Sequence, residues 1–146
     1  MQIRRYQPSD WAELLRMSRA LFPGLVEEDE KELRQTLARP DAAVLVLERD
    51  GGKALAGYVE AGSRSVVDGC TSSPVGYIEA WYVDPDARRA GHGRALLQAA
   101  EQWARDQGYT EMGSDALIDN FVSHKAHTRS GYIEVDRVVT FRKPLM

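Results

Sequence analysis

The sequence of 146 residues contains a single cysteine, Cys70. One cysteine cannot form an internal disulfide, and it excludes a zinc site built from several thiolates. The three histidines, His92, His124 and His127, do not form the HExxH pattern of a catalytic zinc site. We therefore expect neither a disulfide framework nor a bound metal ion.

Long apolar runs and a basic excess are also missing. No run approaches the roughly 18 apolar residues that span a bilayer, and the first ten residues contain no apolar signal core. We therefore expect a soluble, cytoplasmic protein without a membrane partner. Lys and Arg total 19 against 22 Asp and Glu, giving a net charge of −3. Nucleic-acid-binding domains usually carry a basic excess, so we expect no nucleic-acid partner.

The composition that remains is that of a folded globular chain. Hydrophobic residues make up 43% and charged residues 28%, which are ordinary fractions for a folded domain. A chain of this length usually forms one domain, so we expect residues 1–146 to fold as a single unit.

Hydrophobic periodicity divides the chain into predicted helices and strands. The predicted helices cover residues 11–22, a shorter segment that ends at Pro40, 93–107 and 120–129. The predicted strands cover 2–5, 42–48, 54–63, 75–83, 110–114, 132–136 and 139–142. This order of elements predicts a mixed α+β domain built on one central sheet.

The segment most indicative of chemistry is the loop after the strand 75–83. It contains Arg88-x-x-Gly91-x-Gly93 and leads directly into the amphipathic helix 93–107. Glycines allow a ligand to approach the backbone closely, and the first amides of a helix lack internal partners at its positive end. These features predict a phosphate or pyrophosphate site, although glycines that serve loop geometry alone would give the same pattern.

Two common nucleotide motifs do not explain this loop. The pattern GxxxxGK[ST] is absent, so the segment is not a P-loop. A Rossmann fingerprint needs a third glycine or alanine where this chain has Leu96.

The wider pattern resembles the GNAT superfamily of acetyl-CoA-dependent N-acetyltransferases. The resemblance rests on Val83-Asp84-Pro85, the Arg88-x-x-Gly91-x-Gly93 loop, and Asn120, His127 and Gly131-Tyr132 about thirty residues later. It implies a mostly antiparallel sheet of six to seven strands, flanked by about four helices. It also implies acetyl-CoA as co-substrate.

Further segments are similar to one group within that superfamily, the aminoglycoside 6'-N-acetyltransferases. These segments are residues 21–24, 68–75, 78–79 and 111–115, with Ser123-x-Lys125-x-His127 near the end. The resemblance implies direct acetyl transfer, in a ternary complex, to the 6'-amine of an aminoglycoside, and hence antibiotic resistance. Because many members form dimers that share their closing strands, we also expect a homodimer.

Two acidic residues are the candidate catalytic residues. Glu79 lies within an apolar strand, where a carboxylate is costly unless it has a purpose, and strict alternation would place it on one face with Trp81 and Val83. Asp115 follows the next strand. We expect both to bind the substrate amine, and either to accept its proton. The alternatives are an exposed strand residue for Glu79 and an N-cap or Asx-turn residue for Asp115.

The remaining site residues are assigned mainly by the resemblance. It places the strand backbone near Trp81 and Val83 along pantetheine and the loop amides on the pyrophosphate. The expected loop residues are Arg88, Arg89, Gly91, His92, Gly93 and Arg94. Asn120 would contact pantetheine or phosphate, or only cap its helix, and His127 would protonate the leaving thiolate, contact CoA, or serve structure alone. Phe22 and Asp136 are the other expected substrate contacts, with an exposed strand charge as the alternative for Asp136.

Two other functions compete with this hypothesis. A GNAT enzyme for another amine, such as a polyamine or a protein N-terminus, would keep the CoA loop. A module that binds acetyl-CoA or the drug without turnover would release no CoA thiol. Thiol release with a panel of amines therefore separates all three.

Overall fold

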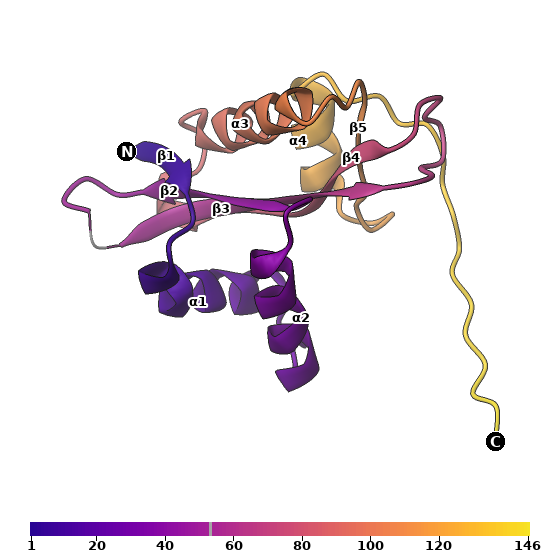
Figure 1. Ribbon diagram of the computed structural model, residues 1–146, viewed down its shortest axis with the longest axis horizontal. Coiled ribbons are helices and arrows are strands. Elements are labelled where there is room, and N and C mark those ends of the chain that lie inside the picture. The colour runs from indigo at the N-terminus through magenta and orange to yellow at the C-terminus, as the bar shows by residue number, and fades with distance from the viewer. Residues whose placement is uncertain (53) are drawn as a thin grey trace. The chain divides into compact units, whose positions relative to one another are not determined.

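Five strands form one sheet in the computed structural model, which describes residues 1–52 and 54–146. In spatial order they are β1 (Gln2–Arg5), β2 (Ala43–Glu48), β3 (Leu55–Arg64), β4 (Val75–Val83) and β5 (Met112–Ser114) (Figure 1). Neighbouring strands pair antiparallel except β4 and β5, which are parallel. The predicted mixed α+β class with a mostly antiparallel sheet is therefore confirmed.

Helices cover both faces of this sheet. α1 (Trp11–Leu21) and α2 (Glu27–Ala38) lie on one face and α3 (His92–Asp106) lies on the other (Figure 1). The sheet and these three helices belong to a compact unit of residues Met1–Asp115. A second unit, Ala116–Met146, contains α4 (Phe121–Arg129), which gives the four helices that were expected.

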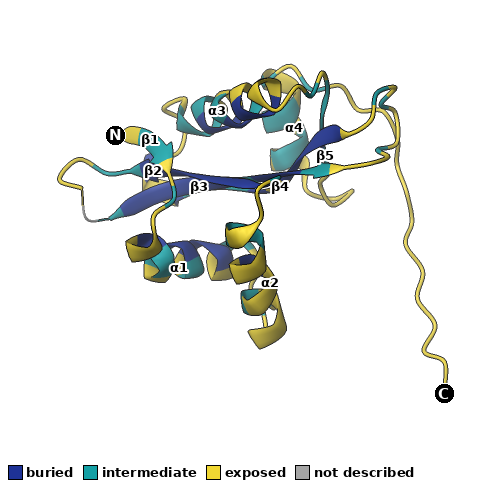
Figure 2. Ribbon diagram, viewed as in Figure 1, coloured by how far each residue is buried: buried dark blue, intermediate teal, exposed yellow. Residues whose placement is uncertain are grey.

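Figure 2 shows that buried residues lie in the central strands and along α1 and α3, and most of these buried residues are apolar. On one face, Leu14 and Met17 of α1 are fully buried and belong to a core that includes Tyr58 and Tyr82. On the other face, α3 buries the stripe predicted from its periodicity, which consists of Leu96, Leu97, Ala100, Trp103 and Ala104. Each fully buried large side chain contributes about 1.5–3 kcal/mol, so β3 and β4 are held firmly between two apolar layers.

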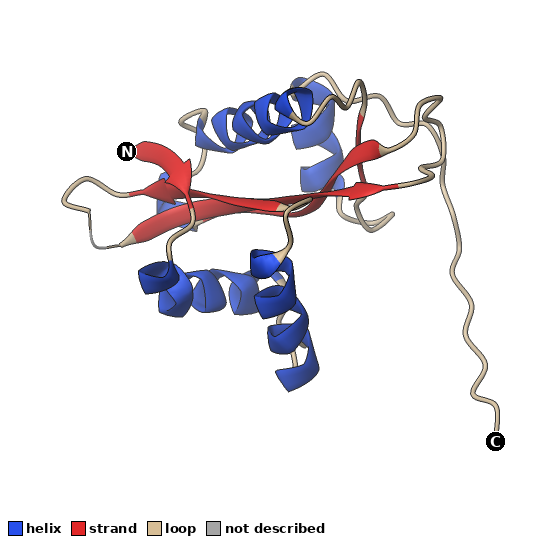
Figure 3. Ribbon diagram, in the orientation of Figure 1, coloured by secondary structure: helices blue, strands red, loops and turns tan. Residues whose placement is uncertain are grey.

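The expected strands over residues 132–136 and 139–142 are wrong. Among the described residues, no helix or strand follows α4 (Figure 3), so the sheet has five strands rather than six to seven. Ile133 is 84% exposed and Phe141 is 92% exposed. A strand needs a neighbouring backbone to satisfy its N–H and C=O groups, and a β-prone sequence does not supply that partner by itself.

No helix of the described residues combines the length and the apolar content needed to cross a bilayer.

Candidate active site

The parallel strands β4 and β5 pair over only a short stretch. Their ladder joins Gly76, Tyr77 and Ile78 to Met112, Gly113 and Ser114. Among the described residues, no strand pairs with the remaining part of β4, residues 79–83, on the β5 side. Backbone N–H and C=O groups on such an edge are open to an added extended chain. Trp81 and Val83 lie on this open stretch.

The loop after β4 ends in a helix N-terminus suited to anions. Gly91 is the N-cap of α3 with a φ of 83°, and no side chain caps the helix there. Arg89 also has a positive φ, of 63°. The first backbone bond of this helix runs from the Ala95 amide to the Gly91 carbonyl at 3.0 Å, so the amides of His92, Gly93 and Arg94 have no helical partner. The predicted strand–loop–helix geometry of a phosphate site is therefore present.

Trp81 fixes this helix end to β4. Its indole Nε1 donates a hydrogen bond to the Gly93 carbonyl at 2.9 Å. A Cβ on Gly93 would lie 3.3 Å from the Trp81 ring, a tight contact that would require the indole to shift by a few tenths of an ångström. The position of the indole therefore favours glycine at residue 93, and the sequence did not reveal this contact.

Arg88 points back toward the strand it follows. Its Nε donates to the Val83 carbonyl at 2.8 Å, and its guanidinium lies 5.7 Å from the centroid of the Tyr82 ring. Arg89 and Arg94 are exposed on the loop and the first turn of α3. Arg88 therefore shapes the loop, and Arg89 and Arg94 present positive charge beside its amides.

A buried carboxylate anchors the start of the loop. Asp84 is 6% exposed and accepts hydrogen bonds from Arg16 of α1 and from Arg49 after β2, at 3.0–3.1 Å. The Asp84 amide donates to the Ala56 carbonyl at 2.7 Å. Burial by itself would raise the pKa of Asp84, but the hydrogen bonds from Arg16 and Arg49 outweigh it and lower the pKa. The sequence did not single out this network, because its members lie far apart along the chain.

Glu79 occupies a β-bulge. The register of β3 and β4 shifts between Glu60 and Ala61, which pair with Ala80 and Ile78, so Glu79 has no cross-strand partner. The Trp81 indole is hydrogen-bonded to α3, on one face of the sheet. Glu79 instead interacts electrostatically with Glu60 and with Arg39, which follows α2 on the opposite face. The expectation that alternation aligns Glu79 with Trp81 and Val83 is therefore wrong, because a bulge interrupts the alternation.

Arg64 and Tyr77 connect the two candidate carboxylates. The Arg64 guanidinium forms two hydrogen bonds to Glu79, at 3.1 and 2.9 Å, and stacks 3.6 Å from the centroid of the Tyr77 ring. The Tyr77 hydroxyl donates to Asp115 at 2.6 Å. The structure thus brings Glu79 and Asp115 into one cluster, which we call the acidic cluster: Arg64, Tyr77, Glu79 and Asp115. Sequence analysis missed Arg64 and Tyr77.

The protonation states in this cluster follow from its contacts. Burial, and then the hydrogen bond to Asp115, raise the pKa of Tyr77. The hydrogen bond to Glu79 raises the pKa of Arg64. At neutral pH the phenol therefore stays a donor and the guanidinium stays charged.

The other predicted residues have different surroundings. Phe22 ends α1 and is 48% exposed. In the second unit, the Asn120 side chain accepts from the Ser123 amide at 3.2 Å, which is the helix-cap role left open above. His127 Nδ1 lies 2.8 Å from the Ser123 carbonyl, and Asp136 is exposed in the segment after α4.

Glu111 fixes the loop that contains Cys70. Its Oε1 accepts hydrogen bonds from the amides of Thr71 and Ser72, at 2.9 and 2.7 Å, and from the Ser72 hydroxyl. Burial and the neighbouring Glu111 raise the pKa of Cys70, so its thiol stays neutral and is a poor nucleophile. The described residues contain no group of three or more potential ligands placed to hold a metal ion.

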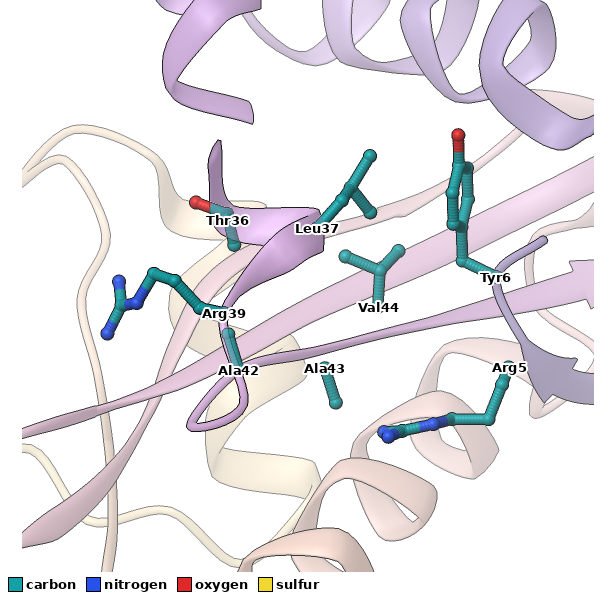
Figure 4. Close-up of a pocket in the computed structure, with 8 residues that line it drawn as sticks. All are labelled: Arg5, Tyr6, Thr36, Leu37, Arg39, Ala42, Ala43 and Val44. Atoms are coloured by element: carbon teal, nitrogen blue, oxygen red, sulfur yellow. The ribbon is translucent and has the colours of Figure 1, made fainter. Parts of the chain in front are cut away.

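A hollow of about 150 Å³ lies between the end of α2 and β2 (Figure 4). Leu37, Val44 and Tyr6 form its apolar part, and Arg39 lies at its margin. The Arg39 guanidinium is already bound to Asp41, at 2.9 and 2.8 Å. None of the residues expected in the active site lines this hollow.

Comparison with known proteins shows the family to which this chain belongs. The sequence model of the acetyltransferase (GNAT) family matches residues 11–132. An aminoglycoside N(6')-acetyltransferase type 1 from Klebsiella aerogenes is 43% identical to this chain. The alignment covers 98% of this chain and 96% of the Klebsiella protein.

Two solved structures match nearly the whole chain. The aminoglycoside antibiotic 6'-N-acetyltransferase AAC(6')-IG from Acinetobacter haemolyticus superposes with a TM-score of 0.91, at 33% identity and full coverage of both chains. AAC(6')-Iy, in complex with the bisubstrate analogue CoA-S-monomethyl-acetylneamine, superposes with a TM-score of 0.90 at 28% identity. That match covers 99% of this chain and 98% of AAC(6')-Iy.

Proposed function

Because the chain belongs to the acetyltransferase (GNAT) family, we propose that it transfers an acetyl group from acetyl-CoA to the 6'-amine of aminoglycoside antibiotics. The observation that carries the proposal is the open stretch of β4 between an anion-binding helix end and the acidic cluster. An anionic, chain-like thioester and a polycationic amine each have a matching surface there. The relatives at 33–43% identity carry the same activity in their names.

Two parts of acetyl-CoA, the pyrophosphate and pantetheine, have complementary backbone groups on this chain. The amides of His92, Gly93 and Arg94 bind the pyrophosphate, with Arg89 and Arg94 supplying positive charge. The backbone beside Trp81 and Val83 pairs with pantetheine as an added strand would. The AAC(6')-Iy complex, in which a CoA-linked aminoglycoside analogue is bound, supports this assignment. The sequence resemblance also supports our proposal that Asn120 and His127 contact CoA.

The acidic cluster binds the antibiotic. Glu79 and Asp115 hold ammonium groups of the sugar by charge-assisted hydrogen bonds. Phe22 and Asp136 add further substrate contacts. The amine attacks the thioester directly while both substrates are bound, and the strand amides near Trp81 polarise the carbonyl. Because acetyl-CoA is a cytoplasmic metabolite, we place the reaction in the cytoplasm, where it protects the cell from the antibiotic.

The assay that tests this proposal measures CoA thiol release with aminoglycosides, polyamines and N-terminal peptides. We expect release with aminoglycosides that carry a 6'-amine. Release with another amine alone would favour the second GNAT function, and binding without release would favour the non-catalytic module.

We propose that the segment after α4 forms strands with a second copy of the chain. Val139 and Phe141 are 75% and 92% exposed, and a single copy leaves these apolar side chains in water. We expect light scattering to give twice the mass of one chain at micromolar concentration. The double variant Val139→Asp/Phe141→Asp is expected to be monomeric. A wild-type protein with the mass of one chain would contradict the proposed dimer.

A further inference from the structure

A third acidic residue, Glu60, lies beside Glu79 in the sheet. Glu60 sits in β3, where its register partner is Ala80 of β4, the residue that follows Glu79. Paired residues on neighbouring antiparallel strands lie about 5 Å apart between Cα atoms. The bulge therefore brings Glu60 and Glu79 to adjacent positions, which agrees with their electrostatic interaction with each other and with Arg39.

The side chain of Glu60 is half-buried in the sheet. Among the described residues, no hydrogen bond or ion pair reaches its oxygens. Among the described residues, every side-chain oxygen that is fully shielded from solvent has a hydrogen-bond partner. Because the Glu60 oxygens have none, they must be in contact with solvent. A carboxylate kept in an apolar strand without a partner is costly, and an external ammonium would relieve that cost.

The charged groups around Glu60 come from each element packed against its strand. Glu79 approaches from β4, and Arg39 approaches from the end of α2. Tyr58 lies two residues before it in β3, and its hydroxyl is hydrogen-bonded to Ser18 of α1. The charged side chains of α1 have other partners, since Glu13 and Arg16 pair with each other and Arg19 pairs with Glu30.

These surroundings give Glu60 an unusual affinity for protons. Burial, and then the negative charge of Glu79, raise the pKa of Glu60 to about 7, against a smaller opposing effect of Arg39. A group with a pKa near the working pH is well matched to accept a proton in general base catalysis.

Resting on the proposed acetyltransferase function, we propose that Glu60 is a further residue of the amine site and accepts the proton that the antibiotic ammonium must lose. The other two carboxylates already accept hydrogen bonds from protein donors, and their remaining lone pairs can still bind an ammonium group. Arg64 donates to both oxygens of Glu79, and Tyr77 donates to Asp115. Glu79 and Asp115 hold the substrate, and Glu60 takes its proton directly or through one water molecule.

The proton and bond changes balance without any further reactant. One proton of the ammonium passes to Glu60 and from there to solvent. The freed lone pair forms the C–N bond to the thioester carbonyl carbon, and the C–S bond breaks. A second proton leaves the nitrogen and ends on the CoA thiol, and the third stays on the amide product.

The test is the pH profile of kcat/KM for a 6'-amino aminoglycoside with Glu60→Gln, Glu60→Asp and the wild type. We expect the wild-type profile to rise with an apparent pKa of about 7. Glu60→Gln should lose this rise and lower kcat about 100-fold at pH 7.5, and Glu60→Asp should restore part of it. Glu48→Gln, at the end of β2 and paired with Arg4, is the control that should keep the wild-type profile.

A second measurement does not depend on turnover. Carboxyl ¹³C NMR of the free protein, with Glu60→Gln for assignment, should show one Glu resonance that titrates near pH 7. A Glu60 resonance that titrates near pH 4, or an unchanged kinetic profile in Glu60→Gln, would overturn the role of Glu60 and leave the acetyltransferase function intact. No turnover by the wild type with any aminoglycoside would overturn both.

Discussion

Replacing Glu79 with Gln is expected to lower kcat/KM for the aminoglycoside about 100-fold, which corresponds to about 2.7 kcal/mol of lost transition-state stabilisation. The variant removes the carboxylate that holds the substrate ammonium, and charge-assisted hydrogen bonds of this kind contribute about 1.5–3 kcal/mol. It also leaves the Arg64 guanidinium, which stacks on Tyr77, without its counter-charge in front of a polycation. The KM for acetyl-CoA should stay within about twofold, because the loop amides do not contact Glu79.

The variant Arg64→Gln separates the two causes of this loss. If Glu79 acts by binding the ammonium, the double variant Glu79→Gln/Arg64→Gln remains as impaired as Glu79→Gln alone. If the loss comes mainly from the exposed guanidinium, the double variant recovers most of the activity. A kcat/KM of Glu79→Gln within threefold of the wild type would contradict our assignment of Glu79.

Replacing Asp84 with Asn is expected to affect both stability and cofactor affinity. The variant leaves Arg16 and Arg49 without their buried counter-charge, and removing the charge of one partner of a buried ion pair costs about 3–5 kcal/mol. Because Arg16 is 45% exposed, we expect a smaller loss of about 2 kcal/mol in the free energy of unfolding. The KM for acetyl-CoA should rise several-fold, since Asp84 holds the start of the phosphate loop.

The pH dependence of this loss has a definite sign. The pKa of Asp84 is lower in the folded protein than in the unfolded chain, so its stabilising effect is present above the unfolded pKa of about 3.9. The effect disappears as the pH falls through the lower, folded pKa. Denaturant titrations of the wild type and Asp84→Asn should therefore differ most at neutral pH and converge in acid.

Asp86→Asn is the matched control for this experiment. Asp86 pairs with the same Arg49, but its side chain is 68% exposed, so its loss should lower the free energy of unfolding far less than the loss of Asp84. Equal losses in Asp84→Asn and Asp86→Asn, or a difference between Asp84→Asn and the wild type that persists in strong acid, would contradict this account.

Local sequence pattern predicted the elements that bury one apolar face. The periodicity of α3 identified its buried stripe, and the glycines before it identified a helix end open to anions. Both features depend on residues within one or two turns, and such short-range information is present in the sequence itself. The position of Glu79 in an apolar strand likewise indicated a functional carboxylate, although the role of that carboxylate is still a proposal.

Features that depend on pairing between distant segments were not predicted. The bulge at Glu79 arises from the register of β4 against β3, which no alternation within β4 encodes. The contacts of Arg64 with Glu79 and of Tyr77 with Asp115 join residues 15 and 38 positions apart. Glu60 carried the same signal as Glu79, an acidic residue within an apolar strand, and that signal could have identified it.

The C-terminal segment shows the opposite error. Its β-prone residues predicted two strands, but a strand forms only where a second backbone is available to pair with it. In the single chain the described residues after α4 have no such ladder.

Acetylation of matched antibiotics tests the central claim most directly. One compound carries an amine at the 6' position, and the other is identical except for a hydroxyl there. With acetyl-CoA and the wild-type protein, we predict one thiol released for each acetyl group gained by the amine, and NMR of the product should place that acetyl group on the 6' nitrogen. Equal thiol release with the 6'-hydroxyl compound, or acetylation of a different amine, would contradict the account.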